Sequence, residues 1–166
     1  LSAAGLSLRG QEMAQGGACH EVPEVGNSFA SSQPDPRLFP QALWGRLMQQ
    51  QWRQGASDWM NYGDPQGLAT LRAAISSYLV QSRGVVCEPE QILILTSSQQ
   101  GILLATQLLI DAGDTVWVED PGYPGARTAM ESAGARIHPV PVDEEGLNPA
   151  GEHPSPRLIY CTPAHQ

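Results

Sequence analysis

The chain has 166 residues, of which 41% are hydrophobic, and its formal net charge at pH 7 is -8. This length is sufficient for one domain with an apolar core. All nine basic residues are arginines spread along the chain, and there is no lysine. Because nucleic-acid affinity depends on clustered Lys and Arg that neutralise phosphates, this composition excludes DNA binding by these residues alone.

The three cysteines, Cys19, Cys87 and Cys161, are widely spaced and form no CxxC pair. This spacing indicates neither a disulfide framework nor a metal site, so we expect a cytoplasmic protein. No apolar run approaches the length of a membrane span, and the first residues lack the order of a signal peptide. Since the chain starts at Leu1 and stops at Gln166, soon after an apolar run, we expect a fragment of a longer protein.

The first half of the chain predicts an arm followed by two helices. Residues 1–34 are rich in Gly, Ala, Ser and Gln and show no sustained period, which favours a linker or arm. Behind Pro40, bulky apolar residues recur at helical spacing up to Trp52, which predicts an amphipathic helix. Asp64-Pro65 is predicted to start a second helix, which ends at Arg83-Gly84.

In the second half, short apolar runs alternate with helical patterns. The predicted strands are residues 91–96, 115–118, 135–142 and 158–162, and the predicted helices are residues 99–110 and 125–133. This order predicts an α/β fold with a mainly parallel sheet flanked by helices. In such sheets ligands bind beyond the carboxyl ends of the strands. We therefore expect a site in the loops that follow Thr96, Glu119 and Thr162.

The first of these loops places Ser97, Ser98 and Gln99 where a strand gives way to a helix. Free backbone N–H groups and the positive end of the helix dipole favour an anion there, and the serine hydroxyls add donors. The alternative is that one serine only caps the helix.

The second loop, residues 119–125, places Tyr123 between prolines and glycines. A flat cofactor ring needs a flat partner, and stiff neighbours would hold this tyrosine in place for stacking. The alternative is a turn whose tyrosine packs on the protein surface.

The third loop, residues 161–166, carries Thr162, His165 and Gln166 at the end of a predicted strand. Of the four histidines, His165 stands at such a strand end, although a single loop histidine is more often an ordinary surface residue. No dinucleotide, Walker, zinc-protease or nucleophile-elbow motif occurs, so we predict no metal.

Several of these segments in order resemble the large domain of fold-type-I aminotransferases. They are residues 62–68 (YGDPQGL), 71–72 (LR), 96–101 (TSSQQG) and 114–123 (DTVWVEDPGY), and the resemblance covers residues 35–166. More narrowly, residues 83–85 (RGV), 119–127 (EDPGYPGAR), 142–147 (VDEEGL) and 162–166 (TPAHQ) resemble the MocR/GabR branch of the GntR regulators. In that branch a winged-helix DNA-binding domain is joined by a linker to an aminotransferase-like domain, which binds pyridoxal 5'-phosphate (PLP) and senses an effector.

The resemblance implies a role for each candidate site residue. Ser97, Ser98 and Gln99 would cradle the phosphate of PLP, and Tyr123 would stack on its pyridine ring. Tyr62 would reach the phosphate of the partner subunit, which implies a homodimer. His165 and Gln166 match the strand-end loop that approaches the cofactor.

The resemblance also implies a domain division and an inactive fragment. Residues 1–34 would be the end of the linker, and residues 35–166 the N-terminal part of the aminotransferase-like domain. The family's pyridine-binding aspartate and its cofactor-binding lysine would lie beyond Gln166, so we predict no catalytic residue here. The chain departs from the family at Gln33, where a glycine is usual, and at Ser97 or Ser98, where a glycine is frequent.

Three interpretations of the intact protein remain open. It is an effector-sensing regulator, a free-standing class I/II aminotransferase, or a cofactor-free interaction domain. The segments at 119–127 and 162–166 and the arm at 1–34 favour the regulator. On that interpretation its partners are a second copy, an amino-acid or amine effector, and DNA through a missing upstream domain.

Overall fold

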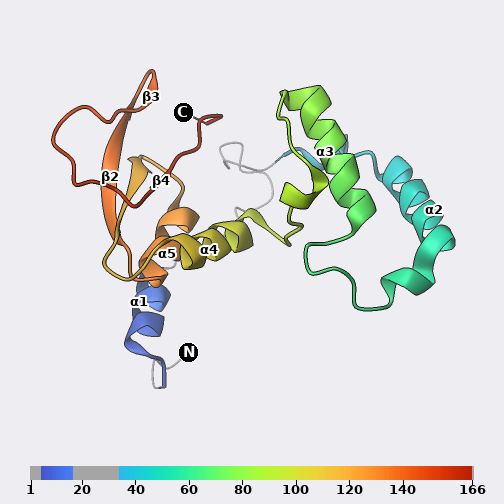
Figure 1. The fold of residues 1–166 in the computed structure, drawn as a ribbon, viewed down its shortest axis with the longest axis horizontal. Coiled ribbons are helices and arrows are strands. Elements are labelled where there is room, and N and C mark those ends of the chain that lie inside the picture. Colours follow the sequence, from blue (N-terminus) through green and yellow to red (C-terminus); the bar gives the residue numbers. More distant parts are fainter. Residues whose placement is uncertain (1–4, 17–33, 166) are drawn as a thin grey trace. The chain divides into compact units, whose positions relative to one another are not determined.

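The computed structural model of the chain describes residues 5–16 and 34–165. Its contacts divide the chain into two compact units (Figure 1). The sheet unit consists of Leu1–His20 with Leu95–Gln166, and the helical unit of Glu21–Ile94. Each unit has its own packing and is described by itself.

The sheet unit is built on a short, mainly parallel sheet. Its strands are β1 (Thr115–Asp120), β2 (Arg136–Asp143), β3 (Gly146–Leu147) and β4 (Leu158–Tyr160), in the order β3-β2-β1-β4. The central strand β1 pairs in parallel with both β2 and β4, whereas β3 returns antiparallel to β2. The predicted parallel sheet is therefore confirmed, and β3 adds a hairpin that the sequence pattern did not indicate.

One face of β1 packs against helices. Val116 and Val118 lie two residues apart on the strand and are buried in a cluster with Ala126 and Met130 of α5 (Pro124–Ser132). Ile102 of α4 (Ser98–Leu109) packs against the same cluster. The alternation of a strand directs these two valines to one side, so α4 and α5 together cover that side (Figure 1).

The other face of β1 carries an aromatic cluster. The rings of Trp117 and His138 lie on neighbouring strands with centroids 6.3 Å apart, and the ring of His153, in the loop before β4, meets both edge to face. The Trp117 indole N–H donates to the Pro154 carbonyl at 2.9 Å. A loop thus covers this part of the sheet.

A helix forms within the predicted arm. Leu8–Gly16 is helix α1, which packs against α5 of the same unit. The assignment of residues 1–34 to a linker or arm stays a prediction, and tertiary contact explains how a helix forms where the apolar period is weak. Residues 17–33 lie outside the described residues, so the domain boundary at residue 34 stays a prediction.

The helical unit contains the two predicted helices. They are α2 (Gln41–Trp59) and α3 (Ala69–Arg83), accompanied by the short 3-10 helices η1 (Pro36–Leu38) and η2 (Pro89–Gln91). Gly84 ends α3 in the left-handed region, at φ +66°, and its N–H donates to the Leu79 carbonyl. The predicted stop at Arg83-Gly84 is confirmed, since glycine adopts this conformation without steric cost.

The predicted start of the second helix is wrong by four residues. Asp64 does not cap a helix: its carboxylate accepts from the Gln66 N–H at 2.8 Å, and its carbonyl accepts from the Gly67 N–H at 2.8 Å. Gly67 has φ +98°, and a Cβ there would lie 2.5 Å from the Ile94 Cβ. This turn needs glycine at residue 67, and α3 starts only after it, at Ala69.

The strand predicted at residues 91–96 is also not formed. Gln91 ends η2, and the Ile94 N–H donates to the Gln66 carbonyl of the turn at 2.9 Å. A strand requires a neighbouring strand for its backbone hydrogen bonds, and none lies beside this run among the described residues. The boundary between the two units falls within the run, between Ile94 and Leu95.

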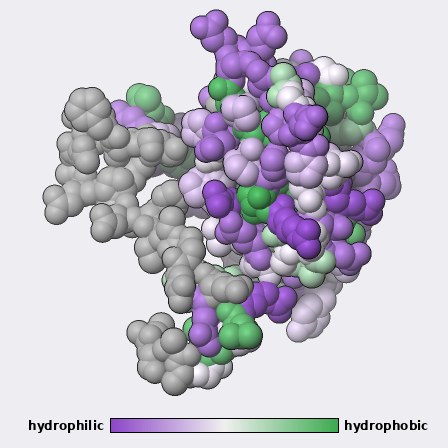
Figure 2. Space-filling view, turned by 90° about the vertical axis from the view of Figure 1, so that its left-hand side faces the viewer, coloured by the Kyte–Doolittle hydropathy of each residue, from purple (hydrophilic) through white to green (hydrophobic). Residues whose placement is uncertain are grey.

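The described part of the helical unit has no buried apolar side chain. Its buried residues are Arg72 and Ser76, while the apolar face of α2, including Trp44 and Trp52, is about half exposed. The sheet unit, whose face is seen in Figure 2, likewise shows hydrophobic side chains between hydrophilic ones on its surface. No described helix combines the length and the apolar character that a membrane span requires.

Candidate functional site

The N-terminus of α4 presents unpaired backbone donors. Ser97 is the N-cap, and its hydroxyl accepts from the Gln100 N–H at 3.2 Å. The Gln100 side chain in turn accepts from the N–H and hydroxyl of Thr96, both at 2.8 Å. Within the described structure the N–H groups of Ser98 and Gln99 make no hydrogen bond, as the first turn of a helix dictates. The capping role of Ser97 is confirmed. The neighbouring N–H groups of Ser98 and Gln99, here called the anion seat, are available to bind an anion.

Tyr123 lies within hydrogen-bonding distance of that helix start. It occupies the N-cap position of α5, in the loop after β1, and is 39% exposed. Its hydroxyl donates to the Gln99 Oε1 at 3.3 Å. The loop is tight, because a Cβ at Gly122 would collide with the carbonyl oxygen of Glu119. The first two predicted loops therefore form one constellation.

Glu119 ties the third loop to the end of β1. Its side chain is buried, with the residue 4% exposed, and both carboxylate oxygens accept from the Thr162 N–H at 3.0 Å. The Thr162 hydroxyl donates to the same carboxylate at 2.7 Å. His165 follows in a turn closed by its own N–H on the Thr162 carbonyl at 2.9 Å, and its ring is exposed. Gln166 lies outside the described residues.

A pocket of about 280 Å³ lies beside Tyr123, and Arg127 and Tyr160 contribute to its lining. Burial raises the pKa of the Tyr160 phenol above its ordinary value, and the nearby Tyr123, Glu119 and Cys161 raise it further. Tyr160 is therefore a neutral hydrogen-bond donor at physiological pH. The Arg127 Nε is bound to Glu131 of the next helical turn at 2.9 Å.

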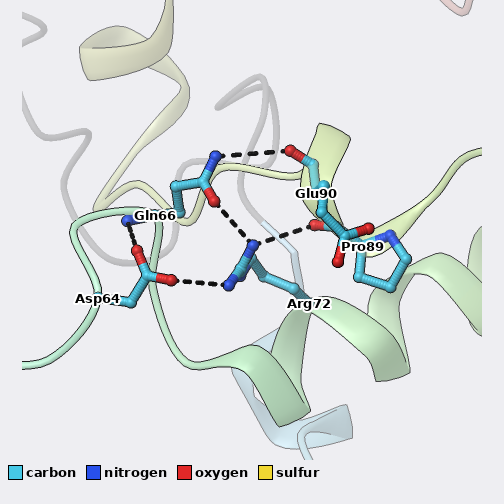
Figure 3. A network of polar contacts seen from close by, with 5 residues as sticks. All are labelled: Asp64, Gln66, Arg72, Pro89 and Glu90. Carbon is cyan, nitrogen blue, oxygen red and sulfur yellow. Dashed lines mark hydrogen bonds and ion pairs between the residues drawn. The ribbon is translucent and has the colours of Figure 1, made fainter.

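Tyr62 belongs to the helical unit, in the segment between α2 and α3, and its side chain is fully exposed. A polar network around Arg72 holds the turn that follows it (Figure 3). The buried guanidinium lies 2.9 Å from Asp64 Oδ2, donates to Gln66 Oε1 at 2.9 Å and reaches the Pro89 carbonyl at 3.4 Å. The turn is thus fixed within its own unit while Tyr62 is accessible to another molecule.

The structure brings four predicted residues together, Ser97, Ser98, Gln99 and Tyr123, and places His165 on the next loop of the same sheet edge. An anion seat beside an aromatic ring suits a flat aromatic phosphate ester. Sequence reasoning missed the buried Glu119, whose one signal was an acid directly after an apolar strand. No group of three metal-ligating side chains occurs within residues 5–16 and 34–165.

The model of the family "Aminotransferase class I and II" matches residues 34–152, more than two thirds of the chain. The chain belongs to this family. It is 38% identical over 162 residues to the probable rhizopine catabolism regulatory protein MocR of Rhizobium meliloti. This alignment covers 97% of this chain and 33% of MocR. It is 31% identical over 145 residues to the HTH-type pyridoxine biosynthesis transcriptional regulator PdxR of Corynebacterium glutamicum, covering 87% of this chain and 31% of the regulator.

The fold agrees with this assignment. The crystal structure of LysN, an α-aminoadipate aminotransferase from Thermus thermophilus, matches with a TM-score of 0.71 at 32% identity. The match covers 81% of this chain and 34% of LysN, which was solved with N-(5'-phosphopyridoxyl)-L-leucine. The predicted fold, part of a fold-type-I aminotransferase domain, is therefore confirmed. The chain spans about a third of the length of these relatives.

Proposed function

We propose that this chain is part of the PLP-binding, effector-sensing domain of a MocR/GabR-type transcriptional regulator. The observation that carries the proposal is the 3.3 Å contact between the Tyr123 hydroxyl and Gln99, which joins an aromatic ring to an anion-binding helix start. The similarity to two regulators supports the regulatory role over the enzymatic one.

In this proposal each residue of the candidate site has a specific role in binding PLP. The N–H groups of Ser98 and Gln99 and the serine hydroxyls bind the phosphate, which the dipole of α4 also attracts. Tyr123 stacks on the pyridine ring, and His165 and Gln166 approach the cofactor from the third loop. When bound, PLP supplies a carbonyl group that condenses with amines. This chain contains no lysine, so the covalent attachment of PLP requires a residue from outside these 166.

The proposed partners follow from charge and exposure. The chain is acidic, with a net charge of -8, so DNA contacts must come from a separate basic segment of the regulator. We propose a homodimer in which the fully exposed Tyr62 reaches the phosphate of the partner subunit's cofactor. The effector is an amino acid or an amine, and the protein acts in the cytoplasm, where its DNA target lies.

The second candidate is a free-standing aminotransferase. It is favoured by the similarity to LysN, whose fold matches at a TM-score of 0.71. The two candidates differ in DNA binding. The intact regulator should slow the migration of a promoter fragment in a mobility-shift assay, whereas the enzyme should not.

Tyr123→Ala in the intact protein tests the proposed site. We expect PLP binding to weaken by at least about fivefold, because aromatic stacking contributes on the order of 1 kcal/mol beyond area burial. The dissociation constant is measured by absorbance titration, with Tyr78→Ala as the control, an exposed tyrosine of α3. An unchanged dissociation constant in Tyr123→Ala would overturn the proposed cofactor site.

Tyr62→Phe tests the proposed sharing of sites. This variant should also bind PLP less tightly, since it loses the hydroxyl that would reach the phosphate. Mixed with a Ser98→Asp variant, whose own phosphate seat repels the anion, it should form mixed dimers with one intact site. Absence of such recovery would show that Tyr62 does not act across a dimer.

A further inference from the structure

The side chain of Gln99 contacts the loop that carries Tyr123, although 24 residues separate the two. Gln99 lies in the first turn of α4 and is half-buried. Its Nε2 donates to the Gly125 carbonyl at 2.8 Å, and its Oε1 accepts from the Tyr123 hydroxyl at 3.3 Å. The carboxamide thus uses both of its ends on one short segment, residues 123–125.

Gly125 is adapted to this contact. A Cβ at this residue would lie 2.6 Å from the Gln99 Oε1 and 2.6 Å from both Cζ and the hydroxyl oxygen of Tyr123. No side chain larger than hydrogen fits there without moving the ring or the carboxamide. The glycine therefore permits the tyrosine to fold back over its own helix start and meet Gln99.

We infer that Gln99 is a positioning residue, whose carboxamide fixes the Tyr123 ring relative to the anion seat at the start of α4. This inference rests on the proposed function, because it assumes that the Tyr123 ring and the anion seat bind the two parts of one ligand, PLP. A short covalent linker joins the aromatic ring to its phosphate and keeps their separation within a narrow range, so a site that binds both must hold its own two parts at a matching distance. Gln99 belongs to both parts: its N–H lies in the anion seat, and its side chain holds the ring.

A purely structural role would give a different pattern. If the carboxamide only stabilised the fold, its loss would lower stability and leave the orientation of a bound ligand unchanged. If it positions the ring, its loss should alter how the ring meets the ligand even when every site is filled. The Tyr123 hydroxyl should then share its effect with Gln99, since one hydrogen bond joins them.

The test uses Gln99→Met, which keeps the unbranched shape and helix propensity but loses both hydrogen bonds. Gln107→Met, at an exposed residue of the same helix, is the matched control. In the intact protein we expect Gln99→Met to weaken PLP binding by up to about fivefold, because a ring that is no longer held loses part of its stacking, which contributes on the order of 1 kcal/mol. The induced circular dichroism of the bound cofactor, recorded at saturation, should also fall, whereas Gln107→Met should change neither quantity.

Tyr123→Phe completes the comparison. It keeps the ring and removes only the hydroxyl, so it should lower the induced circular dichroism less than Gln99→Met does. The double variant Gln99→Met/Tyr123→Phe should be no worse than Gln99→Met alone. Additive losses, or an unchanged dichroism signal in saturated Gln99→Met, would overturn the inference.

A measurement without cofactor separates this inference from the proposed function. In the cofactor-free protein, Gln99→Met should increase the rate at which tetranitromethane nitrates Tyr123, followed by peptide mass spectrometry, because the ring is no longer held. An unchanged rate would overturn the positioning role. If instead the wild-type protein fails to bind PLP while nitration of the variant is faster, the proposed function is wrong and the positioning role of Gln99 remains.

Discussion

Replacing Glu119 with Gln should destabilise the sheet unit by about 2 kcal/mol, because hydrogen bonds to a charged group contribute about 1.5–3 kcal/mol each. The buried carboxylate accepts from the N–H and hydroxyl of Thr162 at 3.0 and 2.7 Å. A carboxamide offers one acceptor oxygen and turns an NH₂ group toward the remaining donor. One charge-assisted bond is lost, and solvent cannot replace it at a residue that is 4% exposed.

Urea unfolding followed by circular dichroism measures this change. The matched control is Glu131→Gln, whose carboxylate is 43% exposed and pairs with Arg127 on the same helix. Such a pair contributes only about 0.3–0.5 kcal/mol. Thr162→Val removes the hydroxyl donor, so in that background the cost of Glu119→Gln should be about 1 kcal/mol smaller. The reasoning is refuted if Glu119→Gln lowers the unfolding midpoint no more than Glu131→Gln does.

Three further predictions concern other parts of the chain. Asp64→Ala should lower the free energy of unfolding by about 2–3 kcal/mol, because it leaves a buried cation short of a partner. Arg72→Met should lower it by only about 1 kcal/mol, because the carboxylate that remains is hydrated. Urea midpoints from tryptophan fluorescence in the opposite order would contradict this. The raised pKa of Tyr160 implies stability that is complete below pH 10 and lost as the pH rises through the folded pKa. Tyr160→Phe should therefore flatten the alkaline decline of the urea midpoint, and an equally steep decline would refute it. Finally, borohydride reduction of this chain with PLP should trap no cofactor on a side chain, because there is no lysine; mass spectrometry finding such an adduct would disprove the prediction.

The site edge was predictable because it follows from strand polarity. The apolar run at 115–118 predicted β1, and the parallel arrangement placed the loops after β1 and β4 on the same edge. Tyr123 and Ser97 were then proposed as site residues from local chemistry, a rigid aromatic turn and a helix cap. Short-range signals and one topological rule were sufficient for these parts of the site.

The errors arose where distant contacts decide the local structure. Asp64-Pro65 has the composition of a helix start, yet the Asp64 carboxylate serves a turn and the buried Arg72. Residues 91–96 have the composition of a strand, yet no strand lies beside them in the described residues. Helix α1 has a weak period and forms against α5. Each outcome depends on a partner that a window of local sequence does not contain.

Topology alone does not complete the site. Adjacent strands lie about 4.8 Å apart, so a shared sheet edge brings loops near one another without setting the distance between their side chains. In this chain two polar side chains set it: Gln99 joins the helix start to Tyr123, and Glu119 joins β1 to the loop of His165. Both residues lie in segments that carry the family resemblance, and their side chains act by hydrogen bonds between segments that are distant in the sequence. Substitutions at these two residues should therefore change the geometry of the proposed cofactor site while its other residues remain unchanged.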